Sequence, residues 1–572
     1  MACRSILQST CACAERPLRP AGLLLAVLLA SGCLASAAQQ PGQLDNTTVT
    51  LQGEVTNAVT GEPLARALVQ IEGDAGAGAL TASDGRYALP DVPLGPQVIA
   101  VRKPGFRDGP AASGPLVVDP EIGPAHTVWV AAQMPDVNFA LTPTAAIRGA
   151  IELSTGDPAA GMVVNLARRT VQQGRSIWQL AATTKTNSDG AYRFAGLAEG
   201  DYIVSTDPAM DSDGAATVMA PGRGAAVARQ GYAAVFYPDA RQPSGAQRIT
   251  LHPGDQADAE LNLTLEPFHA VIATALLPAS LKSGDGTYIA AVLDQSGRQL
   301  AYNAQYDSQT HTVQALLPDG TYTLMLTATG LGAGAQTMLG ATDVSVAGHA
   351  VSGLRIPVAP LQSAPVQLNL QGSGAATNQN GLTAVMLSPA TGWIDDGMMV
   401  AYATGSAPGP MKTATAQAGV YLVHAHPQQG WCESSFTAGG ANLARERLLI
   451  GPSGGAASMQ LTLRDDCARL TLHLPQELSL PAGGEEQFYT VYVVPSFDST
   501  TDVEPITLRP STGGTFALSN LIPGDYRVYT FAQPVRLEYR NPEVMAALPV
   551  DAQTVTLGPG AATDLTVEVP QP

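Results

Sequence analysis

Residues 521–529, LIPGDYRVY, contain the pattern on which the fold prediction depends. Its Pro-Gly-Asp centre is typical of a tight turn, and the tyrosine two places after the glycine begins a run with the period of a strand. Gly524 can adopt the positive φ that such a turn requires. We therefore predict a turn that leads into a strand with one buried face, and we call this pattern the anchor motif.

Four more stretches repeat the anchor motif along the chain. Residues 317–324 (LPDGTYTL) and 197–204 (LAEGDYIV) keep both the glycine and the tyrosine. Residues 417–423 (QAGVYLV) also keep a glycine and a tyrosine, whereas residues 92–99 (VPLGPQVI) keep the glycine alone. The copies are spaced about one small β-domain apart, so we predict a tandem array of about five β-sandwiches and an all-β fold.

The composition of the 572-residue chain agrees with an all-β fold. Glycine (58) and proline (43) are abundant, and they interrupt runs rich in Val, Thr, Leu and Ile, as expected for strands joined by turns. The net charge of −18 argues against nucleic acid or an anionic membrane surface as the main partner, because phosphate groups are bound by clusters of Lys and Arg. No cofactor is predicted.

Residues 1–37 are predicted to be an export signal. Their apolar run, residues 21–30, follows basic residues and is too short to span a membrane. Two cleavage sites compete: residues 29–33 (LASGC) resemble a bacterial lipobox that would lipidate Cys33, and residues 35–37 (ASA) fit ordinary signal peptidase. We favour lipidation. The expected location is therefore the outer membrane or the periplasm, with the cell surface or the medium as further alternatives.

An ordered series of short motifs follows the leader. The series is G-x-V at 53–55, T-G-x-P-L at 60–64, A-x-V-x-I at 67–71, T-x-x-D-G-x-Y at 81–87 and P-G-F at 104–106. Together these motifs resemble the carboxypeptidase regulatory-like domain, a prealbumin-like (transthyretin-like) β-sandwich that recurs in repeat proteins of the bacterial cell envelope. Much of the order returns in residues 147–194, which end on TNSDGAYRF. In each copy we expect the Asp-Gly pair to form a hairpin turn.

A second pattern, two short alternating runs around a turn, marks the ends of the domains and is interpreted as a closing hairpin. Short linkers between the domains lead us to expect a semi-rigid rod. The last three domains are assigned by the phase of the repeat, without the full motif series. The predicted domains are 46–143 and 144–267, both carboxypeptidase regulatory-like, followed by β-sandwiches at 268–361, 362–466 and 467–572.

Two cysteines, Cys432 and Cys467, lie beyond residues 1–37. In an exported protein such a pair is predicted to form a disulfide. The alternative is two buried free thiols.

No catalytic residue is predicted, and the chain is not expected to be an enzyme. The metallocarboxypeptidases that give the family its name need an H-x-x-E pair, which does not occur in this sequence. His424 and His426 lie on one face of a predicted strand, a spacing that metal ligands use. No third ligand is indicated nearby, so no metal site is predicted. The G-x-S-x-G pattern at 451–455 is interpreted as a turn, because a strand rather than a helix follows it.

The resemblance also implies a functional alternative, because prealbumin-like sandwiches are structurally akin to starch-binding modules. Sugar sites need aromatic platforms that stack on sugar rings, and Trp178 and Trp393 are the candidates because they lie outside the repeated framework. The repeated tyrosines, in contrast, are expected in the core.

The leading prediction is a non-catalytic exported protein that acts as a cell-envelope scaffold or binding stalk. Its partner would be an envelope protein or a glycan, and it would touch the membrane only through an N-terminal lipid anchor. The alternative is a carbohydrate-binding protein of the envelope.

Overall fold

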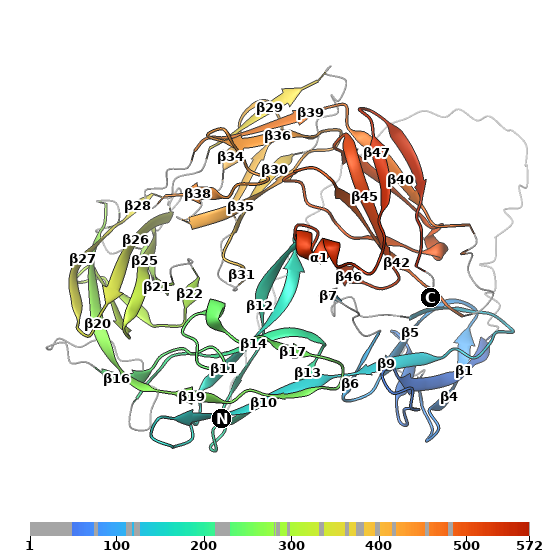
Figure 1. The fold of residues 1–572 in the computed structure, drawn as a ribbon, viewed down its shortest axis with the longest axis horizontal. Helices are drawn as coiled ribbons and strands as arrows, with labels where there is room; N and C mark the ends of the chain where they lie inside the picture. The colour runs from blue at the N-terminus through green and yellow to red at the C-terminus, as the bar shows by residue number, and fades with distance from the viewer. Residues whose placement is uncertain are drawn as a thin grey trace, which may run out of the picture. The chain divides into compact units, whose positions relative to one another are not determined.

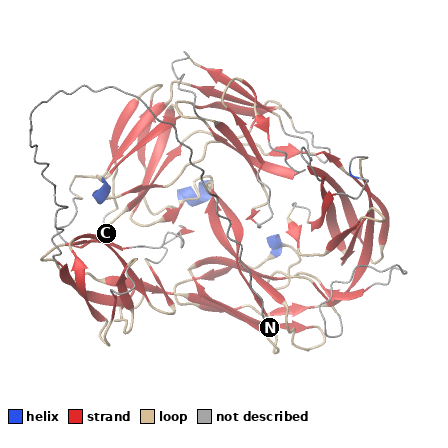
Figure 2. Cartoon of the chain, turned by 180° about the vertical axis from the view of Figure 1, so that it is seen from behind, coloured by secondary structure: helices blue, strands red, loops and turns tan. Residues whose placement is uncertain are grey.

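The computed structural model describes residues 48–570 except for 74–77, 110–116, 119–125, 212–228, 279–280, 282–285, 295–297, 331–336, 361–364, 373–381, 395–400, 414–418, 452–456, 477 and 479–483. Cys33 and the serine of the G-x-S-x-G pattern lie outside these residues. Figure 2 shows that strands dominate, and the longest helix described is the five-residue α1 (Pro542–Ala546). Within the described chain, no helix is long and apolar enough to cross a membrane.

The first sandwich (residues 48–143) packs a sheet of order β4-β1-β9-β6 against one of order β3-β2-β5-β8. Leu51, Val69 and Leu141 are fully buried between the two sheets. The strands are β1 (Thr48–Asn57), β2 (Leu68–Ile71), β3 (Gly78–Leu80), β4 (Arg86–Pro93), β5 (Gly95–Arg102), β6 (Phe106–Asp108), β7 (Val117–Val118), β8 (His126–Val130) and β9 (Phe139–Pro143).

The second sandwich (residues 145–263) repeats this plan, with β13-β10-β18 against β17-β14-β11-β12. Ile147, Leu166 and Tyr202 are buried at its centre. The strands are β10 (Ala145–Leu153), β11 (Val163–Gln172), β12 (Arg175–Lys185), β13 (Ala191–Leu197), β14 (Gly200–Thr206), β17 (Ile249–Leu251), β18 (Gln256–Asp258) and β19 (Leu261–Leu263). The 3-10 turn η1 (Pro243–Gly245) precedes β17.

In the third sandwich (residues 265–360), a sheet of order β16-β20-β24-β23 packs against a sheet of order β22-β21-β25-β26-β28. Its elements are β15 (Ala209–Met210) and β16 (Arg229–Tyr232), which extend its first sheet, then β20 (Leu265–Leu276), β21 (Gly286–Leu293), β22 (Gln299–Leu300), β23 (Ala304–Asp307), β24 (Thr312–Leu317), β25 (Gly320–Gly330), β26 (Thr337–Val346), β27 (Val351–Pro357) and β28 (Ala359–Pro360).

In the fourth sandwich (residues 366–464), a sheet of order β33-β29-β39-β36-β37 packs against a sheet of order β34-β32-β30-β35-β38. The strands are β29 (Val366–Gln371), β30 (Thr383–Pro389), β31 (Trp393–Ile394), β32 (Ala401–Gly405), β33 (Gly409–Pro410), β34 (Lys412–Thr413), β35 (Gly419–His426), β36 (Cys432–Ala438), β37 (Ala441–Asn442), β38 (Leu448–Ile450) and β39 (Met459–Arg464).

In the fifth sandwich (residues 468–569), a sheet of order β44-β40-β48 packs against a sheet of order β43-β42-β45-β47. A segment after β45 also covers the outer face of β42 and β45, where Tyr492 and Phe531 are buried by Leu537. The elements are β40 (Ala468–His473), β41 (Gly484–Glu485), β42 (Tyr489–Pro495), β43 (Ile506–Leu508), η3 (Pro510–Thr512), β44 (Thr515–Leu521), β45 (Gly524–Phe531), β46 (Val535–Arg536), α1, β47 (Gln553–Leu557) and β48 (Ala562–Thr566).

The anchor motif has one structural role throughout. In each sandwich its glycine is the first residue of a strand that lies between two antiparallel neighbours. The first strand of the main sandwich and a strand near its end then pair in parallel in each unit, as β1 with β9, β10 with β19, β20 with β27, β29 with β39 and β40 with β48. Figure 1 shows these units in chain order from blue to red. The predicted all-β array of about five sandwiches is confirmed. The anchor strands are β5, β14, β25, β35 and β45.

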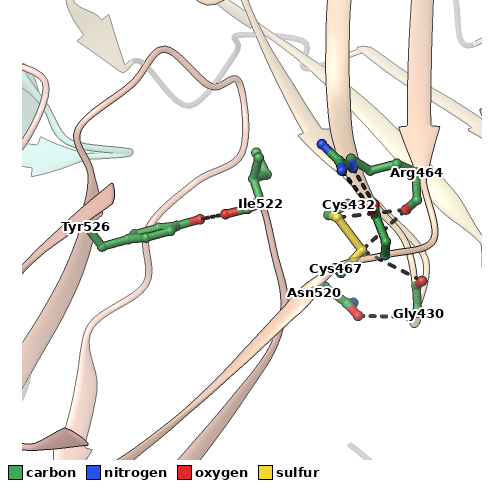
Figure 3. Close-up of a disulfide and its surroundings, with 8 residues drawn as sticks. Gly430, Cys432, Arg464, Cys467, Asn520, Ile522 and Tyr526 are labelled. Atoms are coloured by element: carbon green, nitrogen blue, oxygen red, sulfur yellow. Dashed lines mark hydrogen bonds and ion pairs between the residues drawn. A yellow bond between two sulfur atoms is a disulfide. The ribbon is translucent and has the colours of Figure 1, made fainter. Parts of the chain in front are cut away.

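The tyrosines of the anchor motif fasten the turn to the strand. In three sandwiches the ring is buried and its hydroxyl donates to the carbonyl oxygen four residues earlier, which is the arrangement of a tyrosine corner. Gly200 adopts a φ of 137° at this turn, where a side chain would be strained. The bonds run from Tyr202 to Ala198 (2.7 Å), from Tyr322 to Pro318 (3.2 Å) and from Tyr526 to Ile522 (2.7 Å; Figure 3).

The motif series of the first two sandwiches has a shared mechanical basis. The buried threonine of T-x-x-D-G-x-Y accepts a backbone N–H and donates to a carbonyl, and the tyrosine hydroxyl donates to a carbonyl in the facing segment. The glycine of the first motif leaves room for that same carbonyl, because a Cβ there would overlap it. The equivalent bonds are Thr81 to Leu64 and Tyr87 to Val137 in the first sandwich, and Thr186 to Ala159 and Tyr192 to Ala259 in the second.

Both expected hairpins are wrong. The turn at Asp84 and Gly85 joins β3 in one sheet to β4 in the other. The predicted closing hairpin of the second sandwich corresponds to β17 and β19, and these two strands also belong to different sheets. The sequence of a turn specifies that the chain reverses, but it does not specify which sheet receives the next strand.

Contacts also link sandwiches that are not neighbours in the chain. β41 of the fifth sandwich pairs with β8 of the first, and β31 of the fourth pairs with β12 of the second. A rod of domains in chain order would contact only sequence neighbours, so that expectation is wrong.

Candidate functional site

The β11–β12 hairpin of the second sandwich reaches residues of the fourth and fifth sandwiches. At its tip the backbone N–H of Arg540 donates to the carbonyl of Gly174 (3.0 Å), and the Arg540 guanidinium donates to the carbonyl of Gln173 (3.1 Å). Gly174 has a φ of 71°, and a Cβ at this position would lie 2.5 Å from the Tyr539 ring. Only glycine therefore allows this close approach. Figure 1 shows the tip of this hairpin, where β12 starts, beside α1.

A buried ion pair accompanies this contact. Arg169 of β11 is bonded to Glu538, and their side chains are 18% and 7% exposed. Glu538 also accepts from the side-chain amide of Asn541 (3.0 Å). Both carboxylate oxygens of Glu538 are thus occupied by donors, and its charge is matched by that of Arg169.

A pocket of about 450 Å³ lies beside the hairpin tip. Its walls come from the tip of the second sandwich, from β30, Trp393 and Arg447 of the fourth, and from residues 538–542 of the fifth. Its volume is in the range of ordinary ligand pockets. The polar groups that line it include Arg175, Ser388 and Arg447.

The arginines of the pocket differ in how their charge is balanced. Arg540 lies 3.5 Å from Asp502 and also donates to the carbonyls of Ser499 and Thr501. The guanidinium groups of Arg175 and Arg447 have no hydrogen-bond or ion-pair partner within the described part of the chain. Burial lowers the pKa of Arg175, and the positive charges of Arg540 and Arg447 lower that pKa further.

The two candidate sugar platforms lie together. Trp178 and Trp393 are register partners in the β12–β31 pair, and their stacked rings are 6.2 Å apart. Trp393 also packs against Phe236, and the guanidinium of Arg298 lies 5.0 Å from its ring. Both indoles are half-buried, so other side chains of the protein occupy much of their ring surface.

His424 takes part in a chain of polar side chains. Its Nε2 lies 3.0 Å from the Ser388 hydroxyl, and its Nδ1 lies 2.9 Å from Asp502. His426 follows on the same face of β35, is 45% exposed and lies 3.9 Å from Asp502. No cluster of three metal-ligating side chains occurs among the described residues.

The Ser388–His424–Asp502 chain has the order of a hydrolase triad, but the backbone after the serine differs from a hydrolase. Acyl transfer needs donors that stabilise an oxyanion, often a backbone N–H next to the nucleophile. Here the next residue is Pro389, which has no N–H, and the N–H of Ala390 donates to Val420. We therefore interpret the chain as a structural network between the fourth and fifth sandwiches.

Cys432 and Cys467 form a disulfide with a Cα–Cα distance of 5.7 Å (Figure 3). The bond joins the start of β36 to the residue just before β40. Next to it, the side chain of Asn520 accepts from the N–H of Gly430 (2.8 Å). The disulfide thus fastens the fifth sandwich to the fourth.

The comparison with protein families identifies the first sandwich. Residues 50–135 match the model of the carboxypeptidase regulatory-like domain. This sandwich is a carboxypeptidase regulatory-like domain. The match includes Thr81 and Tyr87, and the second sandwich has the equivalent hydrogen bonds at Thr186 and Tyr192.

Several solved structures are distant matches to this chain. One is the TIE protein of Bacillus anthracis, at 9% identity over 72% of this chain and 69% of that chain, with a TM-score of 0.14. Others are the full-length RrgB pilus protein of Streptococcus pneumoniae (8% identity, 75% and 99% of the two chains, TM-score 0.13) and BcpA, the major pilin subunit of Bacillus cereus (9%, 74% and 98%, TM-score 0.12). Scores this low carry no functional argument. No curated protein matches the chain.

No pattern in the sequence indicates the pocket. Arg175, Ser388 and Arg447 belong to no motif, and they come from two sandwiches whose contact no local pattern predicts. The sequence indicates Trp393 only as an aromatic residue outside the repeat.

Proposed function

We propose that the protein is an exported cell-envelope scaffold or binding stalk, in which the sandwiches are fixed to one another rather than free to move. The observation that carries the proposal is the docking of the β11–β12 tip on residues 538–541, with the buried Arg169–Glu538 pair beside it. Buried charges tolerate little displacement, because separating them leaves each one unpaired. A surface built from several sandwiches is then presented in one arrangement.

The disulfide supports the export part of the proposal. Structural disulfides persist in oxidising compartments and are rare in the cytosol. Cys432–Cys467 closes a loop with a sequence separation of 35. The leader-like residues 1–37 and the lipobox at Cys33 point the same way at the level of sequence.

Mass spectrometry of the mature N-terminus, with fractionation of the producing cells, tests this proposal. We expect a diacylated Cys33 and a protein in the membrane fraction. A free N-terminus at Ala38 would remove the tether but keep export. An uncleaved chain in the cytosol would contradict the proposal.

Carbohydrate binding is the second candidate, favoured by one observation: Trp393 lines a pocket that also carries hydroxyl and amide groups. A glycan array on residues 38–572 tests it, with Trp393→Ala and Trp178→Ala as variants. Saturable binding that both variants lose would support this candidate. Unchanged binding in both variants would exclude these platforms.

A further inference from the structure

We propose that the pocket between the β11–β12 tip, Trp393 and Arg447 binds a small ligand bearing an oxyanion group, that is, a carboxylate, sulfate or phosphate. The site is independent of the envelope location proposed above. A cytosolic protein would still bind the ligand, and a pocket without a ligand would leave the N-terminal processing unchanged.

The first argument is charge. The protein as a whole has a net charge of −18, yet three guanidinium groups and a single carboxylate, Glu538, line this pocket. Arg169 matches Glu538, and Asp502 lies beside Arg540. The guanidinium groups of Arg175 and Arg447 have no ion-pair partner among the described residues, so the pocket has a surplus of positive charge. The charge of Asp502 also acts on Arg175, but Asp502 lies 3.5 Å from Arg540.

The second argument is the cost of this surplus. Like charges brought together disfavour the charged form of each group, and the lowered pKa of Arg175 reflects its burial and its proximity to Arg540 and Arg447. Arginine keeps its proton in proteins, so the repulsion remains unless an anion enters. A bound oxyanion would replace this repulsion with charge-assisted hydrogen bonds.

The third argument is the kind of donor. A guanidinium presents a planar fork that matches the two oxygens of a carboxylate or of a tetrahedral oxyanion. The Ser388 hydroxyl, held by His424 at 3.0 Å, and the amide of Gln173 supply uncharged polar groups in the same pocket. The pocket therefore suits one anionic group carried on a small polar molecule.

Isothermal titration of the mature chain at constant ionic strength tests the proposal, with sulfate, phosphate and glucuronate as probes and glucose as the neutral comparison. We expect saturable binding of at least one anion and none of glucose at the same concentration. Sulfate or phosphate alone would indicate a tetrahedral anion, and glucuronate alone would indicate a carboxylate. Absence of binding by all three anions, or equal binding of glucose, would overturn the proposal.

Variants locate the site. Arg175→Ala and Arg447→Ala should each weaken binding by roughly ten- to a hundredfold, the effect of losing a hydrogen bond to a charged group. Arg175→Lys, which keeps the charge but not the fork, should lose less. Arg355→Ala is the matched control, because Arg355 is an exposed arginine of β27. Equal losses in the control would place the binding elsewhere.

Thermal unfolding supplies a readout that a purely structural arginine would not give. If Arg175 is uncompensated, Arg175→Ala without anion should unfold at the same temperature as the wild type or higher, and only the wild type should be stabilised by the anion. A large loss of stability without anion would show that Arg175 is paired within the protein, and the proposal would fail. Arg447 is exposed, so its variant remains informative if Arg175→Ala does not fold.

Discussion

Single side chains recur at equivalent places because each one closes a specific gap in a sandwich. The anchor tyrosines fill the core with their rings and satisfy a turn carbonyl with their hydroxyls. The buried hydroxyls of Thr81 and Thr186 likewise donate to backbone carbonyls beside the turn before the returning strand. The sequence predicts that the tyrosines lie in the core, but it does not predict the threonine partners, because Leu64 and Ala159 belong to segments 17 and 27 residues away.

Tyr526→Phe isolates the hydroxyl of one anchor motif. The ring stays in the core, but the bond to Ile522 is lost, so the unfolding free energy should fall by about 1 kcal/mol. Denaturant unfolding followed by fluorescence measures this change. Tyr489→Phe is the control, because that hydroxyl has no hydrogen-bond partner among the described residues. Equal losses in the two variants would contradict the role of the tyrosine corner.

His126 makes one contact between the first and fifth sandwiches sensitive to pH. Burial alone would lower the pKa of His126, but hydrogen bonds to Asp108 (2.7 Å) and Glu485 (2.6 Å) outweigh burial and raise the pKa to about 9. The unfolded value is 6.5. The stabilisation is therefore fully present below about pH 6.5 and is lost as the pH rises through about 9.

Thermal unfolding between pH 6 and 10 tests this contact. The wild type should lose more stability over this range than His126→Gln, which carries no titrating charge. Parallel pH profiles for the two proteins would show that the imidazolium does not bridge Asp108 and Glu485.

Sandwiches with the same arrangement of strands make different contacts through those strands. β11 and β12 have ten and eleven residues, and their hairpin tip contacts the fifth sandwich. The repeated motifs predict that these strands belong to a sandwich, but they do not predict how long the strands are. Nothing in the local pattern of β12 indicates that Trp178 will pair with Trp393.

Gly174→Ala tests the contact at the hairpin tip. A Cβ would meet the Tyr539 ring at 2.5 Å and would also be strained at a φ of 71°, with a total cost of about 1–3 kcal/mol. Hydrogen exchange should then accelerate at residues 537–541. Gly156→Ala has a similar φ of 86° but no atom nearby, so it should leave these amides unchanged. Acceleration in both variants would contradict a local contact.

The disulfide is a covalent cross-link between the fourth sandwich and the residue that precedes the fifth. Replacing both cysteines with serine should lower the unfolding free energy by roughly 3–4 kcal/mol in the loop-entropy model. Denaturant unfolding of the double variant against the oxidised wild type measures this loss. Free thiols in the unreduced wild type, detected with a thiol reagent, would contradict the bond.

At the scale of the whole molecule, the local part of the plan was predictable and the long-range part was not. The anchor motif, the alternating strands and the first motif series depend on backbone geometry and burial, so they can be recognised in the sequence. Which sheet takes each strand, and which sandwiches touch, depend on surfaces assembled from distant segments. The pocket belongs to this second class, since Arg175 and Arg447 come from different sandwiches and line it together.

Hydrogen exchange of the intact chain, resolved by peptide, tests the five-sandwich architecture most directly. We predict five separate blocks of slow exchange, each containing one anchor strand: Gly95–Arg102, Gly200–Thr206, Gly320–Gly330, Gly419–His426 and Gly524–Phe531. Rapid exchange at two or more of these strands would contradict it.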